Sequence, residues 1–302
     1  MNLTDQQIER IIKQIEESYY LEHSLQKEKL GIPDNGYFYH HVCDNQDRSS
    51  EFEKTGEFLK WLIKEHPNEF DENTAIKFIN YGDTELVYVI DESGYKRTLL
   101  IGQPNTKFGT VKIEYENLQK LYQQNPKLVV SPTIYLCHEK REAYITPYFY
   151  QARCIASQDI GWGAYIPEPS YYFLKYNEED EYTICTAIIA SLIALYNEKE
   201  KLGLASCKIG GGDFILEKDW DSEPHTIENT LNRMHLIAAR EFISIELEEY
   251  INLLKTEFSR STYYRNISER DLSILINQKN REPMKKTAIE DGITLGLKLR
   301  KN

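Results

Sequence analysis

The sequence predicts an α+β protein, and three features of its pattern predict this class. Apolar residues at helical spacing near the start give way to strand-like alternation after residue 75. Glycine-bearing turns separate the alternating segments, and helical spacing returns for most of the second half. We therefore expect an N-terminal helical extension, an antiparallel meander that begins near residue 75 and a mostly helical second half.

The composition narrows the classes of partner. With 302 residues, 41% of them hydrophobic and 28% charged, the chain is long enough for one large or two ordinary domains. A net charge of −12 argues against a general nucleic-acid binder, which neutralises phosphates with clustered cations, although a nucleotide in a local pocket is compatible. No apolar stretch approaches the roughly 20 residues that span a bilayer, and the start does not read as a signal peptide. We expect a cytoplasmic protein with no membrane partner.

The cysteines and histidines do not predict a metal centre. The 5 cysteines include no CxxC pair, which favours reduced thiols over a disulfide framework or a zinc site. The nearest ligand cluster lies in residues 40–44, where two adjacent histidines on a strand would point to opposite faces. No second ligand pair at zinc spacing exists elsewhere, so we interpret this segment as a polar surface turn.

The first half of the chain predicts two helices and then a sheet. Apolar stripes predict helices over residues 3–30 and 50–65, and a third helix is expected over 110–122. Turns at Gly82 and Gly94 favour an antiparallel meander. The expected strands are 75–82, 85–91, 97–101, 133–137 and 142–145.

The second half is mostly helical in pattern. A helix over residues 181–200 carries apolar residues at helical spacing, among them Ile184, Ile188 and Leu192. A glycine loop and a short strand follow it. Further helices are expected over 226–241, 242–258, 268–279 and 286–300.

The glycine loop within residues 202–216 is the most informative stretch. Three consecutive glycines, Gly210 to Gly212, are followed by Asp213 and an apolar run. Glycine removes the steric bar on positive φ and lets the backbone approach a ligand closely. The order of buried helix, glycine loop and strand suits a binding site. A tight crossover, with Asp213 as a turn or capping residue, is the alternative that the residues leave open.

The order of elements over residues 75–222 resembles the protein kinase-like fold, including its aminoglycoside phosphotransferase branch. The strongest piece is residues 80–89, Asn-Tyr-Gly-Asp-Thr-Glu-Leu-Val-Tyr-Val, which is similar to the family's phosphate-covering turn and the strand over the adenine. The resemblance implies a two-lobed protein kinase-like fold, with an N-terminal helical extension over residues 1–74, a small lobe with an antiparallel sheet over 75–150 and a mostly helical lobe over 151–302. ATP and Mg²⁺ are the cofactors it implies, if the chain binds any.

The resemblance also implies which residues would meet a nucleotide and a metal ion. Glu114 matches the family's helix glutamate, with Glu116 as a register alternative, and residues 145–149 match the hinge that hydrogen-bonds adenine. Asp213 takes the place of the metal-binding asparagine. The implied cofactor-binding residues are Gly82, Thr84, Val87, Glu114, Thr146 and Tyr148, and the implied metal ligands are Asp213, Asp219 and Asp221.

Two positions depart from the family. Where the family has a strand lysine that grips the α and β phosphates, residues 98–101 read Thr-Leu-Leu-Ile. At the place of the catalytic aspartate stands Lys208, a cation that cannot act as a base at neutral pH without a large pKa shift. Lys208 and Asp213 are therefore degenerate catalytic-loop positions, and such losses should remove most of the rate of phosphoryl transfer.

These departures favour a pseudokinase-type protein that binds a ligand or recruits a protein partner. The first alternative is an active ATP-dependent phosphotransferase with a non-standard site. There, Asp213 with Asp219 or Asp221 would hold Mg²⁺. Lys107 or Lys112 would replace the strand lysine.

The second alternative is a protein-interaction module without nucleotide binding. Two amphipathic helices could dock a partner or could pack on their own core: the N-terminal one and the last one, residues 288–299. We expect a protein partner in each case, together with a nucleotide or another small molecule in the first two.

Overall fold

The chain folds into two compact units, each of which is described separately. The sheet unit comprises residues 1–116 and 131–148, and the helical unit comprises residues 117–130 and 149–302. The computed structural model describes residues 4–15, 17, 48–66, 69–70, 74–81, 85–92, 95–102, 106–148, 153–154, 178–205, 214–217, 224–259 and 282–300.

The sheet unit is built around an antiparallel sheet of 5 strands in the order β1-β2-β3-β5-β4. Its strands are β1 (Ala75–Tyr81), β2 (Glu85–Glu92), β3 (Tyr95–Gly102), β4 (Ile134–His138) and β5 (Arg141–Pro147). The first three strands form the expected meander, and β5 pairs with β3 so that Leu100 lies opposite Tyr144. Alternation of apolar and polar residues had predicted each of these strands.

Two helices cover one face of this sheet with a continuous apolar core. A helix over residues 5–15 contributes Ile8, Ile11 and Ile15, and α3 (Arg48–Glu65) contributes Phe58 and Leu62. A capping box starts the first helix: the side chain of Gln7 accepts from the Thr4 backbone N–H, and the Gln7 N–H donates to the Thr4 hydroxyl. The apolar face of this helix is buried in its own core. Of the two alternatives left open for this helix, packing on the chain's own core is therefore confirmed for these residues.

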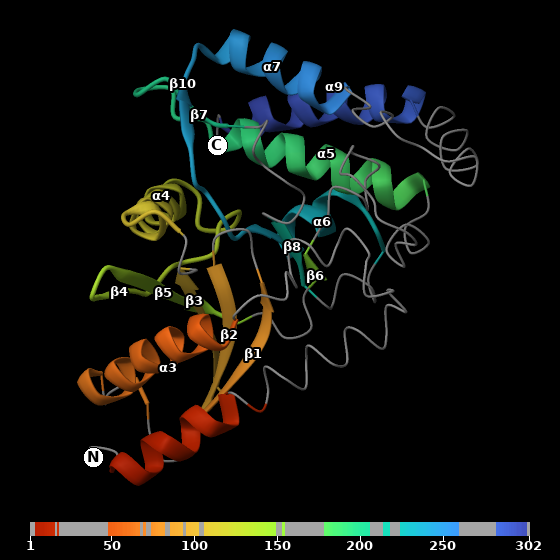
Figure 1. Cartoon of the computed structure of the whole chain (residues 1–302). Coiled ribbons are helices and arrows are strands. Elements are labelled where there is room, and N and C mark those ends of the chain that lie inside the picture. Colours follow the sequence, from red (N-terminus) through yellow and green to blue (C-terminus); the bar gives the residue numbers. More distant parts are fainter. Residues whose placement is uncertain are drawn as a thin grey trace, which may run out of the picture. The chain divides into compact units, whose positions relative to one another are not determined.

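The opposite face of the sheet meets the start of α4 (Thr110–Gln124), as Figure 1 shows with α3 and α4 on either side. The ring of Tyr115 lies 6.2 Å from that of the buried Tyr144 on β5 and 5.6 Å from that of Tyr135 on β4. Val111 is buried near Gly102, where an added Cβ would come within 2.9 Å of its methyl group.

The helical unit is centred on α5 (Glu178–Ala194), which is buried from Thr183 onward. A helix that is apolar on all sides needs neighbours all round it. Two of these neighbours are α6 (Ile227–Arg233) and α9 (Glu282–Leu299), and α7 (Leu247–Ser259) packs on α9 (Figure 1).

Helices α5 and α9 approach so closely because α9 carries glycines one turn apart. A Cβ at Gly292 would lie 2.8 Å from the carbonyl oxygen of Thr186, and one at Gly296 would lie 2.7 Å from the Cβ of Ile193. Ile289 and Ile293 of α9 are buried. Of the two alternatives left open for the last helix, packing on the chain's own core is therefore confirmed for Ile289 and Ile293.

Two small sheets complete the helical unit. One pairs β7 (Leu202–Leu204) with β10 (Phe242–Ser244), and the other has the order β6-β8-β9. The strands of the second sheet are β6 (Arg153–Cys154), β8 (Phe214–Leu216) and β9 (Met234–Leu236).

These sheets overturn two predicted helices. The helix expected over 226–241 ends at Arg233, because Met234 to Leu236 pair with β8. The helix expected over 242–258 begins only at Leu247, because Phe242 to Ser244 pair with β7. Strands this short depend on a partner that local periodicity does not reveal. The helix expected over 268–279 lies outside the described residues.

The architecture is thus α+β, with a small antiparallel sheet and several helices. In the part of the chain that the structure describes, none of the helices combines the length and the apolar character needed to cross a bilayer.

Candidate functional site

Three of the residues implied by the resemblance lie in the sheet unit, two of them on strands and one on α4. Glu114 on α4 is buried, and its Oε1 accepts a hydrogen bond of 3.2 Å from the hydroxyl of Tyr144 on β5. In the strand register, Tyr144 lies opposite Leu100 on β3, which lies opposite Val87 on β2. Thr146 follows two residues after Tyr144. The fold therefore brings Val87, Glu114 and Thr146 into one unit on neighbouring elements.

The end of β5 is where the resemblance places an adenine-binding hinge. Thr146 is buried, and its hydroxyl donates to the carbonyl oxygen of Pro147 at 3.2 Å. The hydroxyl of Thr98, opposite Thr146 on β3, also points to this carbonyl at 3.5 Å. Tyr148 follows directly and is half-buried. The carbonyl of Pro147 thus already receives hydrogen bonds from the protein.

The cations of β3 are engaged with carboxylates away from Glu114. The Nζ of Lys96 lies 3.0 Å from the Oδ2 of Asp91 on β2. Arg97 is buried, forms an ion pair with Glu69 and donates to the backbone oxygen of Glu69 at 2.6 Å. From Thr98 to Gly102 the strand offers only hydroxyl, aliphatic and glycine positions.

The two lysines considered as substitutes for the strand lysine lie on the exposed side of the α4 segment. Lys112 is exposed and its Nζ lies 3.8 Å from the Oε1 of Glu116, whereas Glu114 is buried. Lys107 is exposed in the turn before α4. Neither side chain shares the buried face on which Glu114 lies.

The residues on either side of the glycine loop, Ala205 and Phe214, are both anchored in the helical unit. Ala205 is buried and its N–H donates to the carbonyl of Glu241 at 3.1 Å. Phe214 is fully buried and pairs with Leu236 of β9. The buried amide of Asn117 donates to the carbonyl of Ala239 at 2.8 Å, in the segment that joins β9 to β10. The loop therefore connects two small sheets through anchored ends.

Several predicted site residues lie outside the described residues, and their roles stay predictions. They are Gly82, Thr84, Lys208, Asp213, Asp219 and Asp221. The histidine and cysteine segment at 40–44 also lies outside. Among the described residues, no group of three or more His, Cys, Asp and Glu side chains is arranged to hold a metal ion.

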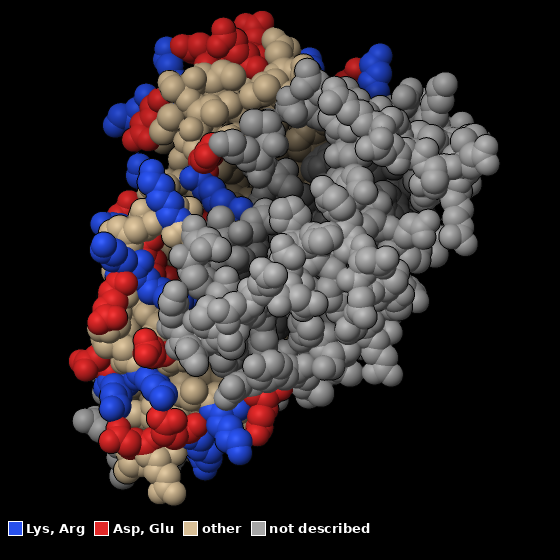
Figure 2. Space-filling model, viewed as in Figure 1, with Lys and Arg blue, Asp and Glu red and all other residues tan. Residues whose placement is uncertain are grey.

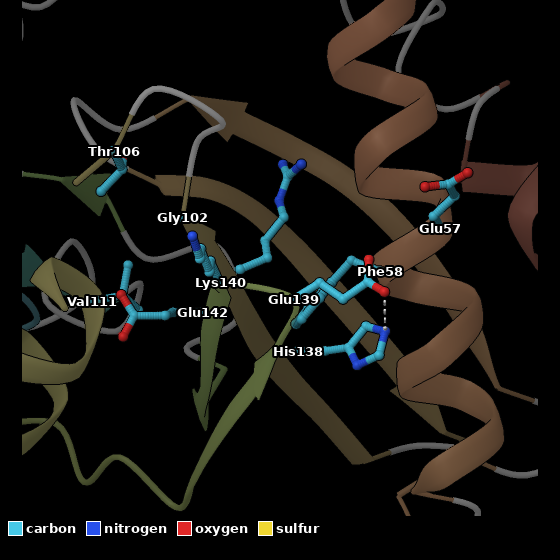
Figure 3. A pocket seen from close by; sticks show the side chains of 10 residues that line it. Glu57, Phe58, Gly102, Thr106, Val111, His138, Glu139, Lys140 and Glu142 are labelled. Atoms are coloured by element: carbon cyan, nitrogen blue, oxygen red, sulfur yellow. Dashed lines mark ion pairs between the residues drawn. The ribbon is translucent and has the colours of Figure 1, made fainter. Parts of the chain in front are cut away.

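The sheet unit also contains a cavity of about 370 Å³ that sequence patterns did not predict. It lies between α3, the end of β3, the start of α4 and the β4–β5 turn. Figure 3 shows Lys140 and Glu142 beside Gly102 and Val111, with His138 and Glu139 near Phe58 of α3. Side chains of both charge signs therefore surround a partly apolar space.

Glu142 is a fixed, buried wall of this cavity. One carboxylate oxygen accepts from the backbone N–H of Gly109 at 2.7 Å, and the other accepts from the hydroxyl of Tyr135 at 2.6 Å. Gly109 has φ +94°, a conformation that favours glycine and that aims its N–H at Glu142. Burial, followed by the neighbouring Glu142 carboxylate, raises the pKa of the Tyr135 phenol. The phenol therefore stays a donor at neutral pH.

The opposite wall is held by aromatic stacking and by an unusual turn. The imidazole of His138 stacks on Trp61 of α3 at 4.5 Å between ring centroids. Glu139 and Lys140 both have positive φ, +46° and +64°, as in a type I′ hairpin turn. Such turns favour asparagine and glycine, so this sequence places two long charged side chains at positions that cost backbone energy.

The helical unit contains a separate groove of about 880 Å³. It lies along residues 120–127, the end of α5 and the end of α9. The guanidinium of Arg300 lies 5.1 Å from the ring centroid of Tyr196, which stacks on Tyr250 at 5.5 Å. The amide of Gln124 donates to the carbonyl of Tyr196 at 3.3 Å. Arg300 also forms an ion pair with Glu198, so its charge is already balanced within the unit.

Sequence reasoning missed the residues that shape the cavity. The expected strands 133–137 and 142–145 left residues 138–141 as a connection and Glu142 as an ordinary strand residue. One signal was available in the sequence: Glu142 stands near the start of a strand whose next residues are apolar. A carboxylate that is buried with such a strand requires hydrogen-bond donors. Those donors, Gly109 and Tyr135, come from distant positions that no local pattern shows.

Comparison with known proteins identifies no family. No family model matches the chain, and no curated protein matches it. Among solved structures, the crystal structure of the BubR1 kinase domain aligns at 16% identity with a TM-score of 0.38, covering 59% of this chain. The alignment covers 50% of that domain, so this chain spans about half of its length.

Proposed function

We propose that this chain is a kinase-like protein with a degenerate catalytic site, which binds a ligand or a protein partner instead of transferring phosphate. The observation that carries the proposal is the pairing of the buried Glu114 with the phenol of Tyr144. In protein kinases the helix glutamate pairs with a strand lysine, and that pair must be in place for phosphoryl transfer. A neutral phenol can hold the glutamate but supplies no charge to phosphates.

The chemistry of β3 supports the same proposal. Its cations, Lys96 and Arg97, are bound to Asp91 and Glu69. Catalysis of phosphoryl transfer depends almost entirely on positioning and on neutralising the charge of the phosphates. Lys208, at the catalytic position implied by the resemblance, adds a cation where a base is required.

A nucleotide is the ligand class that the resemblance favours for this site. Thr146 and Tyr148 would flank an adenine at the end of β5, and Val87 would lie over it. Asp213 would contribute an oxygen ligand for Mg²⁺, with Asp219 or Asp221 as the second. The carboxylate of Glu114 would act through Tyr144 as a positioning group on the same sheet face.

The proposal is tested by measuring thermal unfolding and phosphate transfer on the same protein. A nucleotide at 100 times its dissociation constant adds roughly 2.7 kcal/mol to stability, so Mg·ATP should raise the melting temperature if the site binds it. We expect no transfer of labelled phosphate from ATP to the protein or to water. The matched control is Asp213→Ala, which should remove any Mg-dependent part of the shift.

The same measurements separate the alternatives. Transfer that Asp213→Ala abolishes would overturn the proposal in favour of an active phosphotransferase. A nucleotide-dependent shift without transfer supports the ligand-binding form. If ATP, GTP and Mg²⁺ alone all leave the melting temperature unchanged, the proposed function is binding of a protein partner.

A further inference from the structure

The two edges of the sheet differ in how well they are protected against pairing with another strand. β1, at one edge, carries Lys77 and a register break between Phe78 and Asn80. A lysine and a bulge on an edge strand hinder its pairing with another chain. β4, at the other edge, reads Ile-Tyr-Leu-Cys-His, and its register with β5 is unbroken from Ile134 to His138. The β4 edge therefore has neither of the features that protect β1.

The β4–β5 turn decides which backbone groups of β4 point outward. Both residues of this two-residue turn have positive φ, so His138 and Arg141 are the hydrogen-bonded pair that closes the hairpin. Bonded and non-bonded pairs alternate along an antiparallel ladder. The N–H and C=O groups of Tyr135 and Cys137 therefore point away from β5.

These outward groups are unpaired on a strand that is held in place. In the part of the chain that the structure describes, the backbone hydrogen bonds outside the strands include none at Tyr135 or Cys137, and the Cys137 side chain is exposed. The ring of Tyr135 lies 5.6 Å from that of Tyr115 on α4, and His138 stacks on Trp61 of α3. A strand that is already ordered loses little conformational entropy when it pairs.

The β4 edge is complementary to the same edge of a second copy. When two β4 strands run antiparallel with Leu136 at the two-fold axis, Tyr135 of each copy faces Cys137 of the other. Each facing pair exchanges two hydrogen bonds, so the four outward groups of each strand are all satisfied. A two-fold interface uses the same surface on both copies, and the other edge of the sheet is protected, so the assembly closes at a dimer.

The charges around β4 allow two copies to meet. The strand contains no Asp, Glu, Lys or Arg, and in this register His138 faces Ile134 of the second copy and Glu139 faces Thr133 of the second copy. Figure 2 shows Lys and Arg side chains intermixed with Asp and Glu over the described part of the sheet unit. In a chain with a net charge of −12, an uncharged strand is where self-repulsion opposes contact least.

We propose that the β4 edge is the interface of a homodimer, in which the sheets of two copies join into one continuous antiparallel sheet. Interfaces of this small size are at the weak end of specific association, so the dissociation constant is expected in the micromolar range. The dimer needs no nucleotide and is measured without ATP. Failure of the nucleotide site therefore leaves it standing, and the reverse also holds.

The first test removes one outward N–H of β4 in the full chain. Cys137→Pro lacks the donor that faces the second copy, whereas the matched control Cys137→Ala keeps it, and neither change removes a hydrogen bond to β5. Sedimentation equilibrium across micromolar concentrations should show a dimer for the wild type and for the control. Each copy of the proline variant loses one donor, so its dissociation constant should rise at least about tenfold. Circular dichroism checks that both variants are folded.

The second test determines the register and does not depend on the proline variant. In Tyr135→Cys the new thiol would face the natural Cys137 of the second copy, where the Cα atoms of a hydrogen-bonded pair lie about 5.5 Å apart, within reach of a disulfide. Mild oxidation should link two chains through residues 135 and 137, as identified by mass spectrometry of the linked peptides. Tyr135→Cys/Cys137→Ser is the control and should not form this link.

Three results would overturn the homodimer. A chain that stays monomeric at every concentration would do so, and would leave a strand of another protein as the occupant of the β4 edge. A dimer that Cys137→Pro does not weaken would place the interface elsewhere. Absence of the link between residues 135 and 137 after oxidation of Tyr135→Cys would rule out the pairing of β4 with its copy in this register.

Discussion

The two units of this protein bury their apolar surface in different ways. The core of the sheet unit is filled by large side chains, including Phe58, Phe70 and Ile101, between a sheet and two helices. The central contact of the helical unit depends instead on Gly292 and Gly296, which let α9 approach the backbone of α5. A core filled by side chains can adjust its rotamers, whereas a backbone contact cannot move without moving a helix. Replacing a glycine by alanine should therefore destabilise the protein at the α5–α9 contact and stabilise it at a helical glycine of the sheet unit that has space around it.

The largest effect is expected at the helix contact. In Gly296→Ala the new Cβ would lie 2.7 Å from the Cβ of Ile193 and 2.8 Å from the carbonyl oxygen of Ala190. Overpacking of this kind costs about 1–3 kcal/mol, more than alanine gains in helix propensity. Urea unfolding should show the loss. Unchanged stability would mean that α9 does not pack this closely on α5.

The matched control is Gly56→Ala on α3, where nothing lies within 4 Å of the added Cβ. Alanine is favoured over glycine in a helix by about 1 kcal/mol, so this variant should be more stable than the wild type. If Gly296→Ala and Gly56→Ala both destabilised the protein, the two units would not differ in how they tolerate an added Cβ.

A smaller effect on stability is expected when Glu142, the buried carboxylate that lines the cavity, loses one of its hydrogen-bond donors. Tyr135→Phe removes the hydroxyl that donates to Glu142, and a hydrogen bond to a charged group contributes about 1.5–3 kcal/mol at most. The pKa of the phenol is raised in the folded state, so its contribution is present below its unfolded pKa of about 10 and is lost as the pH rises further.

The wild type should therefore lose stability between pH 8 and pH 11 more steeply than Tyr135→Phe, as measured by urea unfolding at several pH values. Parallel pH profiles would show that the phenol is not buried against Glu142. Phenylalanine retains the ring contact with Tyr115, so packing is matched between the two proteins.

The β4–β5 turn should respond in the opposite direction. Glu139→Asn/Lys140→Gly places the residues favoured by a type I′ turn at φ +46° and +64°, and should stabilise the sheet unit by about 1 kcal/mol. Glu139→Ala/Lys140→Ala removes the same charges but keeps a Cβ at both positions. Thermal unfolding of the two variants separates backbone strain from charge, and equal melting temperatures would exclude strain.

The smallest effect is expected where the N-terminal helix meets α3 at the surface. Asp5 forms an ion pair with Lys64 at 2.8 Å, and the hydrogen bond from Lys64 lowers the pKa of Asp5. Because the pKa of Asp5 is lower in the folded state, the ion pair stabilises the protein at pH values above the unfolded-state pKa of about 3.9. This stabilisation is lost as the pH falls through the folded-state pKa. Asp5→Asn should lower the melting temperature slightly at pH 7 and not at pH 2. An equal difference at both values would assign the effect to something other than this charge.

Much of the sheet unit could be predicted from local patterns. The alternation in residues 75–101 and the turn glycines were sufficient to predict the meander, because a sheet with one buried face requires period-two patterning. The helical spacing of Ile184, Ile188 and Leu192 likewise predicted α5. Of the candidate site, the sequence could offer Glu114 as a special glutamate but not its partner Tyr144, which comes from another element.

The sequence by itself determined the α+β class, the order of helices and strands over most of the described chain, and the absence of a lysine at residues 98–101. Only the tertiary structure decided that Met234 to Leu236 and Phe242 to Ser244 are strands, since their hydrogen-bond partners are β8 and β7. It also decided that Glu142 is buried, because its donors lie 33 residues before it and 7 residues before it in the chain. Periodicity records which face of an element is apolar, whereas pairing and polar burial depend on groups that meet only after folding.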